Sequence, residues 1–347
     1  MEFVKFWDQG DTPVSLEALN VILIAHVREP RGYMNNDQLQ CSETERFSVE
    51  EFNEIYQGIV SAGFFLQAIF FNELDFINAY IEHPNYFKKC LVYTLARNGY
   101  RDNKKTIIPS FCELVGIRYS SSPSLSCALA RNKYYFSTLL QRHSIPVPRS
   151  WLLDENGTWI NGLPENGTKL ICKPSSESAS QGISETKIIN FSTAQKNLKS
   201  YNNHIFQEYI DGFECEVPIL KVKNDVYVLP PIGIDLQGKH ILDETASEHN
   251  HYGFYRLDKY FSIEVVNVIQ EYAEKAFRLL QMDVYGRVDF RITHNGQPFI
   301  IDISTTPYTT KHSSFAYAFK SLGLEYCDVY RAIISAALMR ECNYLKR

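Results

Sequence analysis

The chain has 347 residues, of which 45% are hydrophobic and 22% are charged, and its formal net charge is −5. This composition is typical of a folded globular protein with two or three domains, and it argues against a disordered chain and against a nucleic-acid-binding protein. The longest apolar runs, at 20–25 and 63–71, are too short to span a membrane.

The eight cysteines contain no C-x-x-C pair, and the first residues carry acids and no signal-peptide pattern. We therefore expect reduced, mostly buried thiols in a cytoplasmic protein, rather than a disulfide framework or a zinc cage. No internal repeat or low-complexity segment is evident.

Residues 1–120 have the pattern of an α/β region. The apolar run at 19–27 predicts a buried parallel strand. The segment 47–64 predicts an amphipathic helix, in which Ser48 is the N-cap and Glu51 completes a capping box. The other elements expected here are strands at 65–71 and 88–96 and a helix at 107–116 that ends at Gly116.

The serine-rich segment 120–126 is a candidate domain boundary. A helix from about residue 125 to 143, capped by Ser124, is expected to follow it, and short strands are expected after that helix. Periodic apolar residues predict two further helices, at 262–281 and 326–341. We expect three lobes of α/β and α+β type in series, at 1–120, 121–205 and 206–347.

The segment 287–304 predicts a β-hairpin, because Asn295-Gly296 between alternating apolar runs is the strongest short signal for a two-residue type I′ turn. Such a turn would place Asp289 opposite Asp302, and Arg287 opposite Ser304. The other face of the hairpin would carry Val288, Phe290, Ile301 and Ile303. Like charges in facing positions repel, and a hard divalent cation is the simplest way to neutralise them. The alternative is a solvated edge hairpin with two acids.

Three further residues are weak candidates when each is taken alone. Lys173 ends a strand before a Ser/Gly loop and would suit a phosphate group, although most lysines at strand ends are simply solvated. Lys133 lies in a predicted helix, where an exposed charge is the plainer reading. Glu214 follows a Gly-containing turn and would suit a ribose, whereas an outward-facing strand residue is the alternative.

Two other kinds of site are disfavoured. Residues 244–254 contain Glu248, His249 and His251, but their spacing matches no common zinc pattern, so a mobile polar loop is expected. The histidine and serines at 312–315 have no aspartate nearby to complete a hydrolase triad, and the chain lacks a G-x-S-x-G motif.

Several motifs between about Pro109 and Phe315 together resemble the ATP-grasp superfamily, and specifically its D-alanine–D-alanine ligase-like branch. The segment ARNKYYF resembles the branch's aspartate-lysine stretch, with Asn132 in place of the aspartate. KPSSESASQGIS is similar to K-P-x-x-E-G-S-S-x-G, and FQEYIDGFE is similar to the hinge V-E-x-Y-I-x-G-x-E. RVDFR and DISTTPYTTKHSS resemble R-x-D-x and E-x-N-T-x-P-G-x-T-x-x-S.

The resemblance implies an ATP-grasp fold with an N-terminal α/β domain, and ATP with one or two Mg²⁺ ions as cofactors. It implies an ATP-dependent ligase that joins a carboxylate to an amine through an acyl phosphate. The implied residues are Lys133, Lys173, Glu177, Gln207, Glu208, Tyr209, Ile210 and Glu214 for ATP; Asp289, Asp302 and Ser304 for the metal; Arg287 and Ser180 for catalysis; and Ser313, Ser314 and Tyr308 for substrate.

Departures from the branch change the expected substrate. Its G-G-x-S-x-E pattern and its Y-D-Y-x-x-K-Y loop have no equivalent, Asn98-Gly99 replaces an H-G pair, and Tyr308 replaces a glycine. We therefore expect an amino acid or small peptide other than the usual D-Ala pair, with no nucleic-acid or membrane partner. A homodimer is expected from the resemblance alone. The alternative is a catalytically weak or inactive nucleotide-binding protein with a regulatory or scaffolding role, since Asp302 and Ser304 are shorter than the branch's glutamate and asparagine.

Overall fold

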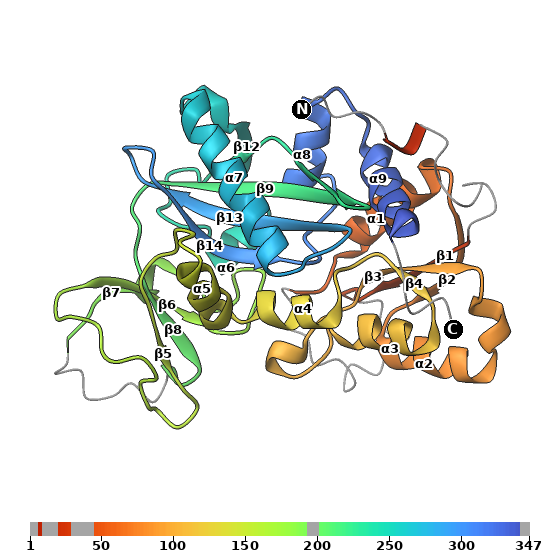
Figure 1. The fold of residues 1–347 in the computed structure, drawn as a ribbon, viewed down its shortest axis with the longest axis horizontal. Helices are drawn as coiled ribbons and strands as arrows, with labels where there is room; N and C mark the ends of the chain where they lie inside the picture. Colours follow the sequence, from red (N-terminus) through yellow and green to blue (C-terminus); the bar gives the residue numbers. More distant parts are fainter. Residues whose placement is uncertain (1–5, 9–19, 29–44, 193–200, 341–347) are drawn as a thin grey trace.

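The computed structural model describes residues 6–8, 20–28, 45–192 and 201–340. Three sheets follow one another along this part of the chain and lie side by side in neighbouring parts of one body (Figure 1). Cys41, Cys342 and most of the N-terminal segment lie outside the described residues. The described cysteines are free thiols, and all of them except Cys327 are buried. No described helix is long and apolar enough to cross a membrane.

The first sheet is parallel, with strand order β2-β1-β3-β4. Its strands are β1 (Asn20–Ala25), β2 (Phe65–Phe70), β3 (Cys90–Leu95) and β4 (Arg118–Tyr119). Every residue of β1 after its first is buried, as its continuous apolar run predicts for a central parallel strand. This sheet confirms the strands expected in the first 120 residues.

The helices of this region begin and end where their capping residues predict. In α1 (Val49–Ser61) both hydrogen bonds of the capping box between Ser48 and Glu51 are present. α3 (Ile107–Val115) ends at Gly116, whose φ of 73° lies in the left-handed region that glycine adopts without strain. Between them lie α2 (Glu73–Glu82) and the 3₁₀ turns at Pro84–Phe87 and Arg101–Asn103.

The single helix expected at 125–143 is wrong. The structure has two helices, α4 (Ser124–Arg131) and α5 (Lys133–Arg142), and Asn132 separates them with extended backbone. The Asn132 side chain accepts hydrogen bonds from two backbone N–H groups of the first turn of α5. Asparagine favours this capping position over a helix interior, and the cap makes Lys133 the first residue of α5.

The second sheet is antiparallel, with strand order β5-β8-β6-β7. Its strands are β5 (Ser150–Leu153), β6 (Lys169–Pro174), β7 (Ile188–Asn190) and β8 (His204–Glu208). The expected boundary between residues 205 and 206 therefore falls inside β8, which pairs on both sides within this sheet. The division into three domains itself stays a prediction.

The third sheet is the largest, with strand order β12-β11-β9-β13-β14, and β10 pairs with β9. Its strands are β9 (Phe213–Val222), β10 (Asp225–Val228), β11 (Ile232–Asp235), β12 (Gly253–Arg256), β13 (Tyr285–Ile292) and β14 (Pro298–Ser304). Helix α7 (Ile263–Leu279) covers one face and packs on apolar side chains such as Val217, Val288 and Phe290 (Figure 1). Because side chains alternate along a strand, the polar residues between these face the opposite side.

The hairpin of β13 and β14 pairs the predicted residues, but through a different turn. Asp289 lies opposite Asp302 and Arg287 opposite Ser304. The loop is not the expected two-residue type I′ turn: Gly296 has φ of 86°, whereas Asn295 stays outside the left-handed region, and the Thr293 N–H donates to the Gln297 carbonyl oxygen.

A β-bulge restores the register of this hairpin. Near the turn Phe290 pairs with Ile300, whereas the two-residue turn would pair it with Ile301. The register then shifts between Asp289 and Phe290, which leaves Ile301 as the extra residue. Ile300 consequently lies in the core, and Ile301 lines the cavity described below instead of pointing into the core.

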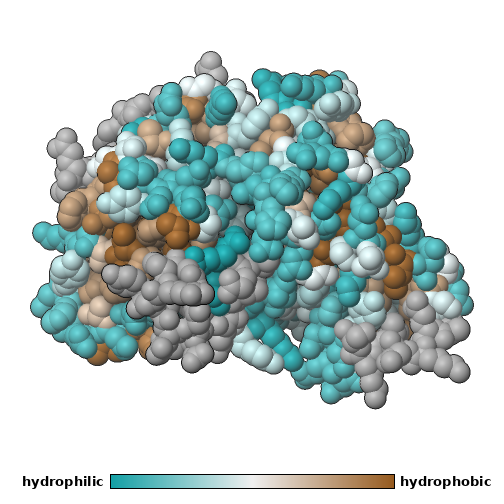
Figure 2. Space-filling model, turned by 180° about the vertical axis from the view of Figure 1, so that it is seen from behind, coloured by the Kyte–Doolittle hydropathy of each residue, from teal (hydrophilic) through white to brown (hydrophobic). Residues whose placement is uncertain are grey.

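The C-terminal helices close the molecule against its N-terminal part. α8 (Ser314–Ser321) and α9 (Tyr326–Met339) share an apolar core with α1 and with the strands β1 and β3. The predicted helices 262–281 and 326–341 are thus confirmed, to within a few residues at their ends. Seen from behind, hydrophilic side chains cover much of the molecule, and separate apolar patches lie between them (Figure 2).

Candidate active site

A deep cavity lies where the second sheet, the third sheet and the α4–α5 pair meet. Every residue that the sequence singled out for ATP, metal or catalysis lines it, and of the three substrate candidates Tyr308 does so. These lining residues are Lys133, Lys173, Glu177, Ser180, Gln207, Glu208, Tyr209, Ile210, Glu214, Arg287, Asp289, Asp302, Ser304 and Tyr308. The structure therefore brings together residues that are more than 170 positions apart in the chain.

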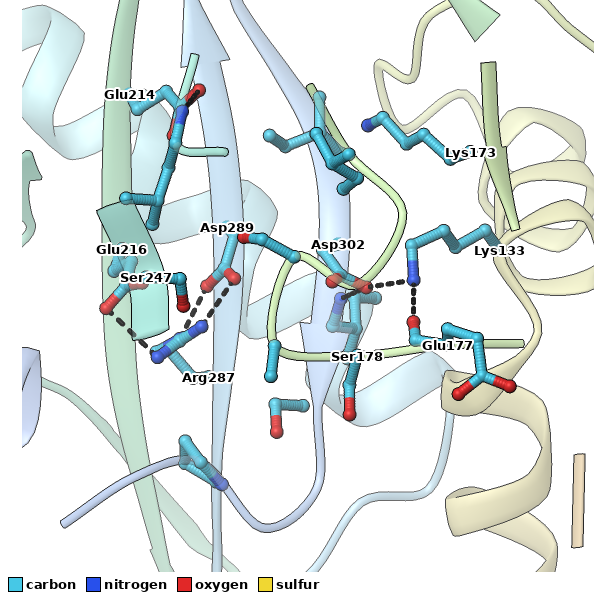
Figure 3. Close-up of a pocket in the computed structure, with 18 of the residues that line it drawn as sticks. Lys133, Lys173, Glu177, Ser178, Glu214, Glu216, Ser247, Arg287, Asp289 and Asp302 are labelled. Atoms are coloured by element: carbon cyan, nitrogen blue, oxygen red, sulfur yellow. Dashed lines mark hydrogen bonds and ion pairs between the residues drawn. The ribbon is translucent and has the colours of Figure 1, made fainter. Parts of the chain in front are cut away.

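Three carboxylates form a row across neighbouring strands of the third sheet. Asp289 on β13 lies between Glu216 on β9 and Asp302 on β14. Arg287 neutralises part of this row: its Nε and Nη2 donate to the two carboxylate oxygens of Asp289 at 2.7 and 2.8 Å, and its Nη1 lies 3.1 Å from Glu216 Oε2 (Figure 3). The fork geometry of a guanidinium suits this contact with two acids.

The row still carries an excess of negative charge. Burial, reinforced by Glu216 and Asp302, raises the pKa of Asp289 to about 7, although Arg287 opposes the shift. Burial lowers the pKa of Arg287, but Asp289 and Glu216 more than offset this and raise it, so this arginine stays charged. A cation placed at this carboxylate would offset the repulsion that raises its pKa.

The residues present fit a hard divalent cation whose other ligands are the phosphates of a bound substrate and water. Asp289 and Asp302 supply carboxylate oxygens from facing positions, and Ser304 supplies a hydroxyl two residues further along β14. Among the described residues, no three His, Cys, Asp or Glu side chains are placed to hold a metal by themselves. Mg²⁺ is typically bound in this way, by one or two carboxylates plus substrate phosphates and water.

Two buried lysines lie beside the carboxylates. Lys133 Nζ lies 3.5 Å from Asp302 Oδ1 and donates to the backbone oxygen of Glu177 at 2.5 Å (Figure 3). Lys173 Nζ donates to Gln207 Oε1 at 3.0 Å. Burial, together with the positive charge of Lys133, lowers the pKa of Lys173 to about 8. Two adjacent, desolvated cations are a favourable place for an anionic phosphate chain.

The hinge between the second and third sheets carries the residues expected to face a nucleoside. Glu214 Oε1 accepts from Arg291 Nη1 at 2.8 Å and from the Leu242 N–H at 3.2 Å. Arg291 also donates to the backbone oxygens of Ile210 and Gly212. A Cβ on Gly212 would lie 1.9 Å from the Ile292 carbonyl oxygen, so only glycine allows this close approach of hinge and hairpin.

Two of the predicted substrate residues do not reach the cavity. Ser313 and Ser314 are buried and are not among the lining residues. The Ser313 hydroxyl is the N-cap of α8, where it accepts from the Ala316 N–H and donates to the Thr310 carbonyl oxygen. The segment 244–254 is also not one loop, because α6 (Glu244–Glu248) forms in it and β12 begins at Gly253.

A charged cluster beside the cavity was missed from the sequence. Glu45, which is fully buried, binds Arg131 Nη2 at 2.7 Å and Lys104 Nζ at 3.1 Å. Both cations also contact Glu177. These residues come from distant segments, so no local pattern predicts their meeting. Glu216 was missed too, although its spacing of two residues from Glu214 on one strand would have placed it on the same face.

Comparisons with known proteins identify the family of this chain. Residues 142–335 match the family model for the D-ala D-ala ligase C-terminus. A D-alanine–D-alanine ligase of Nitrosospira multiformis is 30% identical over 237 residues, which cover 65% of this chain and 72% of the relative. One from Cupriavidus pinatubonensis is 28% identical over 236 residues, with coverage of 65% and 70%.

The fold agrees as well. The crystal structure of D-alanine–D-alanine ligase from Bacillus anthracis complexed with ATP matches with a TM-score of 0.66 at 20% identity, over 92% of this chain and 98% of that one. This match shows the same ATP-grasp fold. The chain therefore belongs to the D-Ala–D-Ala ligase C-terminus family, and it is a divergent ATP-grasp ligase of the class that forms carbon–nitrogen bonds.

Proposed function

We propose that this enzyme joins a carboxylate to an amine at the expense of ATP, through an acyl phosphate, and that its substrates are an amino acid or small peptide other than the D-Ala pair. The observation that carries the proposal is the facing pair of Asp289 and Asp302 with Lys133 3.5 Å from Asp302. A divalent cation and a phosphate chain would both be held there.

The residues of the cavity divide into three roles. Lys133 and Lys173 would bind phosphate oxygens, and Glu214 with the hinge residues 207–210 would hold the nucleoside. Asp289, Asp302 and Ser304 would hold Mg²⁺, which when bound neutralises the transferring phosphate group. Arg287 would donate to Asp289 and to the reacting oxygens at the same time. It would thereby stabilise the negative charge that develops when the amine attacks.

The substrate assignment is supported by the residues around Tyr308. Its ring packs at 4.6 Å from the Arg97 guanidinium carbon, and its hydroxyl accepts from Arg97 Nη1 at 3.2 Å. The D-Ala ligase-like pattern has glycine at this position, so a large ring and a cation occupy space that the pattern leaves to backbone. Asn98, at the position of the H-G histidine, donates to Glu73 at 2.7 Å.

Turnover of mixed substrates tests the proposal. Purified protein is incubated with Mg-ATP and pools of amino acids and dipeptides, and ADP release is followed while mass spectrometry detects new amides. We expect ADP release that depends on a pool and matches the amide formed. Tight nucleotide binding without turnover in every pool would argue for a different function.

A second candidate function is nucleotide binding without ligation, because Arg287 engages both oxygens of Asp289. Calorimetry separates the two. A ligase should bind a non-hydrolysable ATP analogue with a steep dependence on Mg²⁺, whereas a regulatory binding protein that leaves Arg287 on Asp289 should bind it equally well without the metal.

The lowered pKa of Lys173 predicts a pH-dependent affinity for ATP. The anionic phosphate chain binds the charged lysine, and in the free protein that charge is lost as pH rises through about 8. Above this pH the dissociation constant of the Mg²⁺ complex of a non-hydrolysable analogue should rise by up to about tenfold per pH unit. Lys173→Met should bind more weakly at pH 7 and show a flat profile up to pH 9. Lys88→Met, at an exposed lysine outside the cavity, is the matched control and should keep the wild-type slope.

The cytoplasmic location and the homodimer stay predictions from the sequence. Gel filtration coupled to light scattering would decide the oligomeric state directly.

A further inference from the structure

Lys105 is a buried basic side chain that has no partner among the described residues. It is 9% exposed, it lines the cavity, and no described residue gives it a hydrogen bond or an ion pair. Its backbone φ of 69° lies in the left-handed region, which costs a lysine free energy. Burying an unpaired charge is expensive, and such a group is retained where a ligand supplies the missing counter-charge.

The neighbours of Lys105 make its position still less favourable. Burial, together with the positive charges of Arg97 and Arg131, lowers the pKa of Lys105 well below its ordinary value, and Glu45 offsets this only in part. The two acids of the cluster, Glu45 and Glu177, are already engaged by Lys104 and Arg131. Among the described residues this cluster has four basic side chains and two carboxylates, and neither carboxylate forms an ion pair with Lys105.

Polar groups that suit an anion line the same cavity. Thr305, Thr306 and Tyr308 line it, and the Thr306 hydroxyl is buried without a hydrogen-bond partner among the described residues. The Tyr308 hydroxyl lies 3.2 Å from Arg97 Nη1. This segment directly follows Ser304, so its four residues reach no further than about 14 Å from the end of β14.

The cations here are a different group from those proposed for phosphate. The charges that act most strongly on Lys173 are those of Lys133, Asp302, Glu214 and Arg291. Those that act on Lys105 are Arg97, Arg131 and Glu45. The cavity therefore has one set of cations around Lys173 and another around Lys105, and the two sets meet at Glu177, whose backbone oxygen accepts from Lys133 and whose carboxylate contacts Lys104 and Arg131.

We propose that Lys105, with Arg97, Thr306 and Tyr308, binds a carboxylate of the substrate that does not react, so that the enzyme acts on an acidic amino acid or another dicarboxylate. This inference rests on the proposed ligase function and names the substrate class for it. A dicarboxylate places one carboxyl group at the metal site for activation and the second beside Lys105. Neutral substrates would leave the lysine buried without a counter-charge, and they would bind more weakly for that reason.

The test compares matched substrates in wild type and two variants. ADP release is measured with aspartate against asparagine and with glutamate against glutamine, each added to a pool of the remaining amino acids. Succinate or glutarate, which carry no amine, show whether the dicarboxylate is the acyl donor. We expect wild type to prefer the acidic member of a pair, and Lys105→Met to lose on the order of 10- to 100-fold in kcat/KM for it. The KM for ATP should not change, and Lys105→Arg should recover part of the preference.

Binding and stability give readouts that need no turnover. Calorimetry with a non-hydrolysable ATP analogue present should show binding of the acidic ligand to wild type and weaker binding to Lys105→Met, with Lys88→Met as the control. Lys105→Met should raise Tm in the absence of ligand, because an apolar side chain replaces a buried amine that no described residue pairs with, whereas loss of a structural lysine would lower Tm.

The outcomes separate this inference from the function on which it rests. Equal use of acidic and neutral members by wild type, or a changed KM for ATP in Lys105→Met, would overturn the dicarboxylate site and leave the ligase proposal standing. If no pool is turned over but acidic ligands still bind wild type more tightly than Lys105→Met, the ligase proposal is overturned and the anion site stands.

Discussion

Replacing Asp289 by asparagine should lower kcat/KM for ATP-dependent turnover by about 10³-fold or more. The variant loses one of the two carboxylates that face each other across β13 and β14, and with it a charge that would hold Mg²⁺ at the phosphate chain. A loss of this size corresponds to about 4 kcal/mol of transition-state stabilisation, the range expected when a metal centre fails. Coupled ADP-release kinetics at saturating Mg²⁺ measure the effect.

The same variant should fold normally, which separates catalysis from structure. Asparagine is close in shape to protonated aspartate, and Arg287 keeps its ion pair with Glu216. Because the folded-state pKa of Asp289 is raised from 3.8 to about 7, wild type without Mg²⁺ should lose stability relative to Asp289→Asn as pH rises from about 4 to about 7. Asp225→Asn, at an exposed residue of β10, is the matched control and should change neither the turnover nor the pH dependence of stability. Full activity in Asp289→Asn would show that the metal assignment is wrong.

Replacing Glu45 by alanine should lower the free energy of unfolding by about 3–5 kcal/mol, the cost of breaking a buried ion pair from one side. Glu45 is 0% exposed and binds Arg131 and Lys104, and it also accepts from the Ser178 hydroxyl at 2.6 Å. Among the described residues its loss leaves Glu177 as the acid for both cations, close to Lys105, which has no ion pair there. Thermal and urea unfolding measure the change, and Glu165→Ala, at an exposed loop residue, should stay within about 0.5 kcal/mol of wild type.

Two further measurements identify the cause of this loss. Arg131 and Lys104 hold the pKa of Glu45 below its ordinary value of 4.5, although burial raises it. The stabilisation from Glu45 is therefore present above about pH 4.5 and is lost as pH falls, so wild type and Glu45→Ala should converge in acid. Glu45→Ala should also lower the free energy of unfolding by less in a Lys105→Met background, since one basic side chain of the cluster is then absent. An equal cost in both backgrounds would mean that the two charges do not interact.

The hairpin of β13 and β14 shows what can be predicted from residue patterns alone. The alternation of side chains along a strand and a turn near Asn295-Gly296 predict that Asp289 lies opposite Asp302. The structure confirms this pairing. The route to it was wrong, because a longer turn displaces the register and the bulge at Ile301 corrects it. The side of a sheet that a residue faces is fixed by burial of the apolar face, so it survives an error in the turn.

Local chemistry in the sequence determined the strands of the first sheet, the capping box of α1, the ATP-grasp resemblance and the candidate residues that line the cavity. These features depend on neighbours in the chain, such as Ser48 with Glu51 or a motif of fixed spacing. Tertiary structure alone decided that Glu45 meets Arg131 from 86 positions away, that Glu216 joins the carboxylate row, and that Lys105 lies buried with no ion pair to any described residue. The reason is physical: burial and Coulomb energy depend on distance in space, and no short stretch of residues records which distant charges will share a low-dielectric interior.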